Sequence, residues 1–283
     1  DYVLAIDGLG RTADLKGWVT INNQSGATYS GAKLKLLAGD VQRVREQMAR
    51  GGFGGGAMAM EAKADRGFEQ ESFAEYHLYT RGRPATVRQN EMKQISLLEG
   101  TGVPVRKRLV VDAMRNFRGY RANEGEVGTG PIKPQVRIEL TNDQKSNLGM
   151  PLPKGKVKVF QRDTKGSLQM LGEDSIDHTP RDEKLSLVVG HSFDIVAERK
   201  RTHFEWIGAD NARRGTRESF EIEVRNRKDT PETVEVMERN WGQWNITSKS
   251  HEFSKLDSNT ILFVLNLKAG ETQKVVYTIE TRW

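Results

Sequence analysis

Apolar and polar residues alternate along much of the chain with a period of two, which is the pattern of half-buried antiparallel strands. Phe220–Val224 has an apolar residue at every second position and a glutamate at each position between. Ile261–Leu267 and Lys274–Trp283 form a further pair of strands, and Ala269-Gly270-Glu271 between them predicts a hairpin. Because sustained helical periodicity is nearly absent, the chain is predicted to be all-β.

One local pattern recurs three times: a strand runs into an asparagine, a polar loop follows and a second strand returns. Asparagine tolerates left-handed backbone angles and can hydrogen-bond its own turn, so it suits the end of a strand. Such units, closely spaced, build immunoglobulin-like sandwiches, and we predict two β-sandwich domains of immunoglobulin or fibronectin-III type. The strand pairs are Trp18–Asn23 with Ala32–Leu37, Val136–Thr141 (followed by Asn142) with Lys156–Phe160, and Glu221–Arg225 (followed by Asn226) with Thr233–Glu238.

Two segments depart from the strand pattern. Val41–Arg50 predicts a short helix that Gly51–Gly56 ends, and Gly51–Gln70 then predicts a mobile loop rich in Gly, Ala and Met. Asn123–Lys133, with three glycines and a proline, is the candidate domain boundary. The expected domains are therefore residues 1–128, with the glycine-rich insert near 51–70, and residues 129–283.

The amino-acid composition excludes several kinds of functional site. The 283 residues carry 44 Lys+Arg and 38 Asp+Glu, a thin basic excess that is spread along the chain and identifies no partner. The absence of cysteine excludes disulfides, thiolate catalysis, iron–sulfur clusters and Cys-ligated zinc, and no cofactor is indicated. No stretch approaches the roughly 20 apolar residues that span a bilayer. The chain starts at Asp1 without a leader, and we read it as a mature fragment.

Few segments suggest a reaction. Gly51–Gly56 lacks the Gly-Lys-Ser/Thr ending of a phosphate loop, and no Gly-x-Ser-x-Gly elbow is present. The strongest polar candidate is Asp174, Asp177 and His178, which could bind a divalent metal or transfer protons. On an extended strand Asp174 and His178 share one face while Asp177 lies on the other, so an acidic turn is the alternative.

Two other groups of residues suggest binding. Basic clusters such as Arg106–Arg108 and Arg199–Arg201 fall on strands, where alternation places most of them at solvated outer positions; no nucleic-acid partner is predicted. Trp241 and Trp244 would meet only if the strand bends at Gly242. They are a candidate sugar- or peptide-binding pair, with core packing as the alternative.

Several stretches, taken in order, resemble a known family. They are Ala13–Ile21, Leu34–Val41, Glu75–Tyr79, Lys93–Leu98, Leu152–Val157, Leu171–Pro180 and Tyr277–Trp283. Together they resemble the bacterial domain of unknown function numbered 4139, the C-terminal part of mucoidy-inhibitor-A-like proteins. The resemblance implies a signal peptide and a further region upstream, and hence a periplasmic, cell-surface or extracellular protein. It implies no activity, catalytic residue or cofactor, and at most a link to surface polysaccharide.

Two hypotheses follow. The preferred one is a non-catalytic cell-envelope protein that binds a protein partner or self-associates through edge strands or the glycine-rich segment. The alternative is a metal-dependent hydrolase that acts on envelope polysaccharide and is centred on Glu173–His178.

Overall fold

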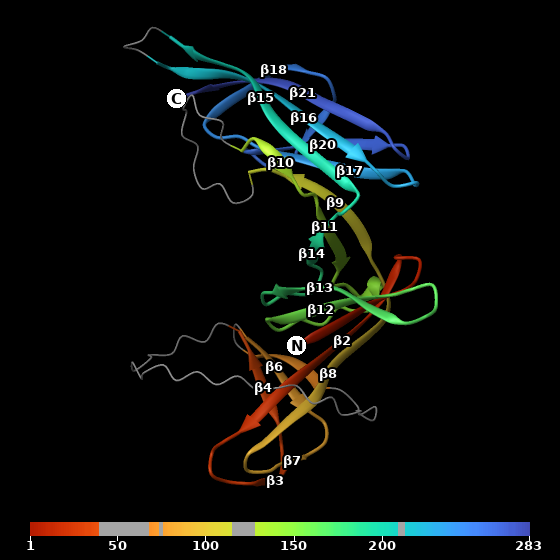
Figure 1. Cartoon of the computed structure of the whole chain (residues 1–283). Coiled ribbons are helices and arrows are strands. Elements are labelled where there is room, and N and C mark those ends of the chain that lie inside the picture. Colours follow the sequence, from red (N-terminus) through yellow and green to blue (C-terminus); the bar gives the residue numbers. More distant parts are fainter. Residues whose placement is uncertain (40–67, 74–75, 115–127, 209–212) are drawn as a thin grey trace. The chain divides into compact units, whose positions relative to one another are not determined.

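The structure, a computed structural model, describes residues 1–39, 68–73, 76–114, 128–208 and 213–283 (Figure 1). Within these residues the regular structure consists of 21 strands and one short 3-10 helix, Gln144–Ser146. The prediction of an all-β chain is confirmed. The predicted helix Val41–Arg50 lies outside the described residues, as does the glycine-rich insert up to residue 67; Phe68 already belongs to a strand.

The strands form three large sheets and two small ones. The first large sheet contains, in order, β13 (Leu168–Ile176), β12 (Gly155–Arg162), β1 (Tyr2–Ile6), β2 (Thr12–Asn23) and β8 (Glu91–Pro104). The second contains β14 (Lys184–His191), β11 (Gln135–Thr141), β9 (Arg106–Asp112), β17 (Glu232–Arg239), β20 (Thr260–Leu267) and β19 (Phe253–Lys255). The third contains β10 (Gly130–Ile132), β15 (Ile195–Ile207), β16 (Gly215–Asn226), β21 (Thr272–Arg282) and β18 (Gln243–Lys249). The small sheets are β3 (Tyr29–Ala32) with β7 (Ala85–Val87), and β4 (Lys35–Ala38), β6 (Tyr76–Arg81) and β5 (Phe68–Phe73).

The pairing reveals a five-position repeat, which we label a to e. Strand a pairs with strand b, strand b pairs antiparallel with strand e, and strands c and d form an antiparallel pair between them. The strands of the three recurring units of the sequence occupy positions b and c of this repeat, except that the structure divides the predicted strand Ala32–Leu37 between β3 and β4. Positions a to e are β1, β2, β3–β4, β6–β7 and β8 in the first repeat, β9, β11, β12, β13 and β14 in the second, and β15, β16, β17, β20 and β21 in the third.

Successive repeats are joined by parallel strand pairing. β1, at position a of the first repeat, pairs in parallel with β12, at position c of the second. β9, at position a of the second repeat, pairs in the same way with β17, at position c of the third. Each of these two c–d hairpins is thus completed by the a strand of the repeat before it.

A buried asparagine fixes the end of strand b in each repeat. The side-chain amide of Asn226, which is 0% exposed, donates to the carbonyls of Thr230 and Lys268, at 2.8 and 2.9 Å, and its Oδ1 accepts from the backbone N–H of Lys228. Asn142, also 0% exposed, donates to two carbonyls in the same manner, and Asn23 donates to three. Each asparagine thereby ties the b–c connection to the d–e connection of its own repeat.

The d–e turn carries a second shared feature. Asn90, Asp182 and Gly270 adopt positive φ values of 56°, 67° and 70°, a conformation that these residue types tolerate best. A glutamate follows each of them in the sequence. The carboxylates of Glu91 and Glu271 accept from backbone N–H groups three residues earlier, and this contact lowers the pKa of both. The turn into strand e is therefore built from local hydrogen bonds.

The pairing of strands between successive repeats also determines how the chain divides into compact units. One compact unit contains Asp1–Arg106 and Leu140–Leu187, and the other contains Lys107–Glu139 and Val188–Trp283. This is not the expected division into residues 1–128 and 129–283. The difference has a physical cause: the hairpin of β12 and β13 completes the sheet of β1, so it belongs with the first repeat. The described part of the chain contains no helix with the length and apolar character needed to cross a bilayer.

The second unit has one hydrophobic core between two sheets. Alternate residues of β15, β16 and β21 on one side meet alternate residues of β9, β17 and β20 on the other. The ring of Tyr277 on β21 lies 5.7 Å from that of Phe263 on β20, so aromatic packing connects the sheets. Leu109 and Val111 of β9 lie in this core, which shows that the a strand of the preceding repeat adds apolar side chains as well as backbone pairing.

Three polar side chains are buried in the same core. The guanidinium of Arg199, 3% exposed, binds the carboxylate of Glu238 at 2.8 Å, and the hydroxyl of Tyr277 donates to that carboxylate at 2.5 Å. The Arg199 guanidinium also lies 3.8 Å from the ring centre of Phe220. The prediction that this basic cluster is solvated is therefore wrong for Arg199, because the carboxylate and the aromatic ring replace water around its charge.

The corner asparagines should be sensitive to any change of the amide. We expect Asn226→Ala to lower the free energy of unfolding by about 2–4 kcal/mol, because two carbonyls and one N–H lose their partners. Asn226→Asp should also destabilise the protein, since a carboxylate cannot donate. Asn266→Ala on the exposed face of β20 is the control, with a change within about 0.5 kcal/mol in urea unfolding. Equal effects at both positions would contradict this role of the corner.

The buried tyrosine should make stability fall at high pH. Burial first, and then the Glu238 carboxylate, raise the pKa of Tyr277 well above 10. Its contribution is complete below pH of about 10 and is lost above it, because the unfolded chain releases the phenolic proton first. We expect Tyr277→Phe to destabilise the protein by about 1–3 kcal/mol at pH 8 and to reduce the further loss between pH 9 and 11. Urea unfolding across this pH range measures both effects.

Candidate functional site

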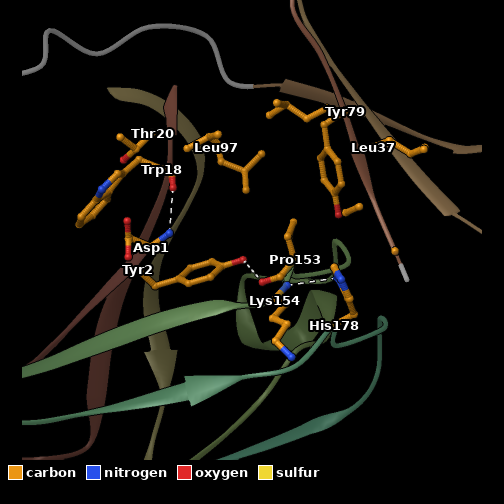
Figure 2. A pocket seen from close by; sticks show the side chains of 14 residues that line it. Asp1, Tyr2, Trp18, Thr20, Leu37, Tyr79, Leu97, Pro153, Lys154 and His178 are labelled. Carbon is orange, nitrogen blue, oxygen red and sulfur yellow. Dashed lines mark hydrogen bonds between the residues drawn. The ribbon is translucent and has the colours of Figure 1, made fainter. Parts of the chain in front are cut away.

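The first repeat contains an open cavity of about 490 Å³ (Figure 2). Strands β1, β2 and β8 line one side of it, and β4 and β6 line the other. A hollow of about 420 Å³ adjoins it and shares Tyr79, Pro153 and His178. We refer to the larger space, lined by Tyr2, Trp18, Leu36, Tyr79 and Leu97 among others, as the β4 cavity.

Glycines on both neighbouring strands, Gly17 on β2 and Gly155 on β12, leave room for the Tyr2 ring. A Cβ atom added at Gly17 or at Gly155 would lie 2.9 Å from the Tyr2 ring. The ring therefore lies across both glycines, and its hydroxyl donates to the carbonyl of Pro153 at 2.6 Å. Burial, and then the neighbouring Tyr79, raise the pKa of Tyr2, so its hydroxyl stays a donor at neutral pH.

Tyr79 approaches the same segment from the other side of the cavity, as Figure 2 shows. It is 1% exposed, and its hydroxyl donates to the carbonyl of Pro151 at 2.7 Å. Burial raises the pKa of Tyr79 to about 12. The hydroxyls of both tyrosines thus donate hydrogen bonds to the segment Pro151–Pro153 and hold it in place at the cavity.

Apolar and polar residues alternate along β4 and the two residues before it, as in a strand that packs on a core, but the apolar side chains are not fully buried. Leu34 and Leu36 face inward but are only half-buried, while Lys33, Lys35 and Leu37 are exposed. The four consecutive residues Leu36–Gly39 all line the cavity, so the backbone edge of the strand borders it rather than one face alone.

The equivalent residues of the other repeats are fully enclosed. Lys33-Leu34-Lys35-Leu36 matches Lys156-Val157-Lys158-Val159 and Thr233-Val234-Glu235-Val236. The four valines in these segments are 0–2% exposed, and each of the two strands has an a strand beside it in parallel. β4 pairs with β6 on one side and with no other strand that the structure describes. The β4 cavity therefore borders a strand edge whose partner position is filled in the other two repeats.

One residue that lines the cavity has a hydrogen-bond donor without an acceptor among the described residues. The indole N–H of Trp18 is enclosed and has no acceptor within the described part of the chain. A buried donor without an acceptor costs free energy.

The predicted acidic–histidine residues lie beside the cavity without converging. The carboxylate of Asp177 is exposed and binds the Lys154 ammonium at 2.9 Å, an ion pair that lowers the pKa of Asp177. Asp174 accepts from the backbone N–H of Ser175, and His178 Nδ1 accepts from the backbone N–H of Lys154. Only His178 lines the β4 cavity. Among the described residues no three His, Asp or Glu side chains are grouped as metal ligands, and Asp174, Asp177 and His178 form no such group.

The predicted tryptophan pair lies in the second unit. Gly242 has a φ of +70°, so the chain bends where the pair requires it. Trp244 packs against the hydrophobic core, its indole N–H donates to the carbonyl of Ser258, and the Lys255 ammonium lies 4.4 Å from its ring centre. Core packing accounts for Trp244, and Trp241 is half-buried. Ligand contact by this pair stays a prediction.

Comparison of the chain with protein-family models, with curated proteins and with solved structures finds no match in any of the three. The resemblance to the mucoidy-inhibitor-A-like family therefore stays a hypothesis.

Sequence reasoning placed Ala32–Leu37 correctly as a returning strand but missed its role at a site. The signal lay in the three matching segments, in which the first repeat has leucines where the others have valines. The sequence could not reveal which of the three c strands has no parallel partner among the strands that the structure describes.

The two glycines beside Tyr2 give a direct test of this wall of the cavity. We expect Gly17→Ala to destabilise the protein by about 1–3 kcal/mol, because the new methyl group displaces the Tyr2 ring and breaks its hydrogen bond to Pro153. Gly82→Ala is the matched control, since a Cβ there meets nothing within 4 Å. Thermal unfolding of both variants measures the difference. Equal loss in the two would contradict the packing of Tyr2 against Gly17.

Proposed function

We propose that this protein is a non-catalytic module of the bacterial cell envelope that binds an extended polypeptide strand in the β4 cavity. One observation carries the proposal: position c pairs in parallel with a neighbouring strand in two repeats, and in the first repeat the same edge borders a cavity. Binding would complete the small sheet and cover Leu34 and Leu36.

Strand addition accounts for both the affinity and the selectivity of such a site. Main-chain hydrogen bonds along β4 bind any extended segment, while pockets for alternate side chains select its sequence. The chain contains two natural examples of the ligand. Tyr2 and Leu4 lie beside β12, and Leu109 and Val111 lie beside β17, with apolar residues at every second position. A ligand with this alternation fits the half-buried leucines of the first repeat.

The envelope location rests on the family resemblance, which also suggests surface polysaccharide as a further ligand. Fractionation of the native host, with antibody detection, tests the location. The alternative of a metal-dependent hydrolase at Glu173–His178 has less support, because the carboxylates there are engaged by lysines or by their own backbone.

Strand binding is tested with a peptide of the chain's own a strand. A fluorescein-labelled peptide of the sequence Asp1–Asp7 presents Tyr2, Leu4 and Ile6 on one face, and we expect it to bind with an increase in fluorescence anisotropy. Leu36→Asp should weaken binding at least about tenfold, since a charge would replace an apolar contact worth roughly 1.5–3 kcal/mol.

Met92→Asp is the matched control, because Met92 is an exposed apolar residue on β8 that does not line the cavity, so this variant should leave binding nearly unchanged. The same peptide carrying Leu4→Ser should bind weakly to the unmodified protein. If the peptide does not bind, or if both aspartate variants bind it as the parent does, strand binding in the β4 cavity is excluded.

A further inference from the structure

The a strand of the third repeat, β15, has the kind of edge that pairs with strand c at the two internal junctions. β15 occupies position a, as β1 and β9 do, and it pairs with strand b of its own repeat along its length. Its other edge, which in the first two repeats pairs with strand c of the next repeat, pairs only with the three-residue strand β10 within the described residues. Within the described residues, the third repeat therefore presents an a strand whose outer edge pairs only with β10, and the first repeat presents a c strand without a parallel partner.

We infer that β15 of one copy pairs in parallel with β4 of a second copy, so that the protein assembles head to tail. The inference rests on the proposed function and identifies its ligand. It requires no new type of contact, because the β1–β12 and β9–β17 pairs already show this junction twice within one chain. A head-to-tail contact of this kind joins two different surfaces, so it yields rings or open chains of molecules rather than a symmetric dimer.

The inner face of β15 has the alternation that the acceptor requires. Ile195 and Ala197 are 1% and 0% exposed and face the hydrophobic core, as Leu109 and Val111 of β9 do. In the assembled form these residues would extend the apolar row formed by the leucines of the acceptor strand. This is the arrangement that the β9–β17 pair has in the core of the second unit.

Charged side chains lie on the outer faces of both strands. At the β9–β17 junction Arg108 of one strand binds Glu235 of the other at 2.9 Å, and Arg239 binds Asp112 at 2.8 Å. Ion pairs across the outer face are thus part of the junction. The acceptor presents two exposed lysines, Lys33 and Lys35, and the outer face of β15 presents Glu198, which in the single chain pairs with Lys200 on the same face.

β10 has to leave the edge of β15, and its pairing there is short. Gly130, Pro131 and Ile132 pair with Arg199, Glu198 and Ala197, which makes three residue pairs. The internal parallel junctions contain five and four pairs. Pro131 has no N–H to donate, which weakens the strand further. Replacement of β10 by β4 of another copy therefore increases the number of paired residues.

Disulfide trapping tests the inference, because the chain has no cysteine of its own. Two variants of the full chain, one with Lys35→Cys and a second, larger tagged one with Glu198→Cys, are mixed at high concentration and oxidised. Adjacent residues on paired strands are close enough for a disulfide, so we expect a mixed dimer that separates by mass. Lys33→Cys replaces Lys35→Cys in a parallel mixture to cover a shift of two residues.

Val276→Cys is the matched control for Glu198→Cys, since it is exposed on the same sheet but lies on β21, between β16 and β18. A mixed dimer with Glu198→Cys that exceeds the control at least tenfold, and that Leu36→Asp abolishes, supports the inference. Equal yields with Glu198→Cys and Val276→Cys, or no dimer from either lysine position, overturn it. Binding of the Asp1–Asp7 peptide distinguishes the outcomes: if it binds without self-association, the cavity takes a strand from another source, and strand binding itself stands.

Discussion

A strand at the edge of a sheet has backbone N–H and C=O groups on one side without partners, and a two-stranded hairpin has two such edges. In the second and third repeats the c–d hairpin meets that constraint at one edge through the a strand of the preceding repeat. The same pairing brings apolar side chains, as with Leu109 and Val111, so it completes the core together with the sheet. β4 pairs with no such strand among the described residues, and there the inward leucines are half-buried and a cavity lies beside them.

Much of the local structure could be predicted from the sequence because it depends on local chemistry. Alternation along Phe220–Val224 is sufficient to predict a strand, and a strand that ends at Asn226 identifies the corner. The order of strands in the sheets could not be predicted in this way. β1 pairs with a strand from the next repeat, and nothing near Tyr2 in the sequence indicates that Val157 is its partner. The division of the chain was predicted incorrectly for the same reason.

Candidate chemistry was harder to predict than strands, because residue types alone do not fix where side chains converge. Asp174, Asp177 and His178 are neighbours in the sequence, but each has its own nearby partner and they form no common centre. Arg199 shows the opposite error: alternation in a charged run suggested solvent, whereas Glu238 and Tyr277 from distant strands create a buried polar pocket for it. For Arg199, partners far away in the sequence determine where the side chain lies.

The exchange of strands between repeats also affects the order in which the protein can fold as it is made. β1 precedes its parallel partner β12, which follows only after the whole first repeat has been translated. β9 waits in the same way for β17. Such a chain cannot fold one repeat at a time behind the ribosome, and each a strand spends part of synthesis with an open apolar edge. During synthesis these strands are therefore open to mispairing until the next repeat is complete.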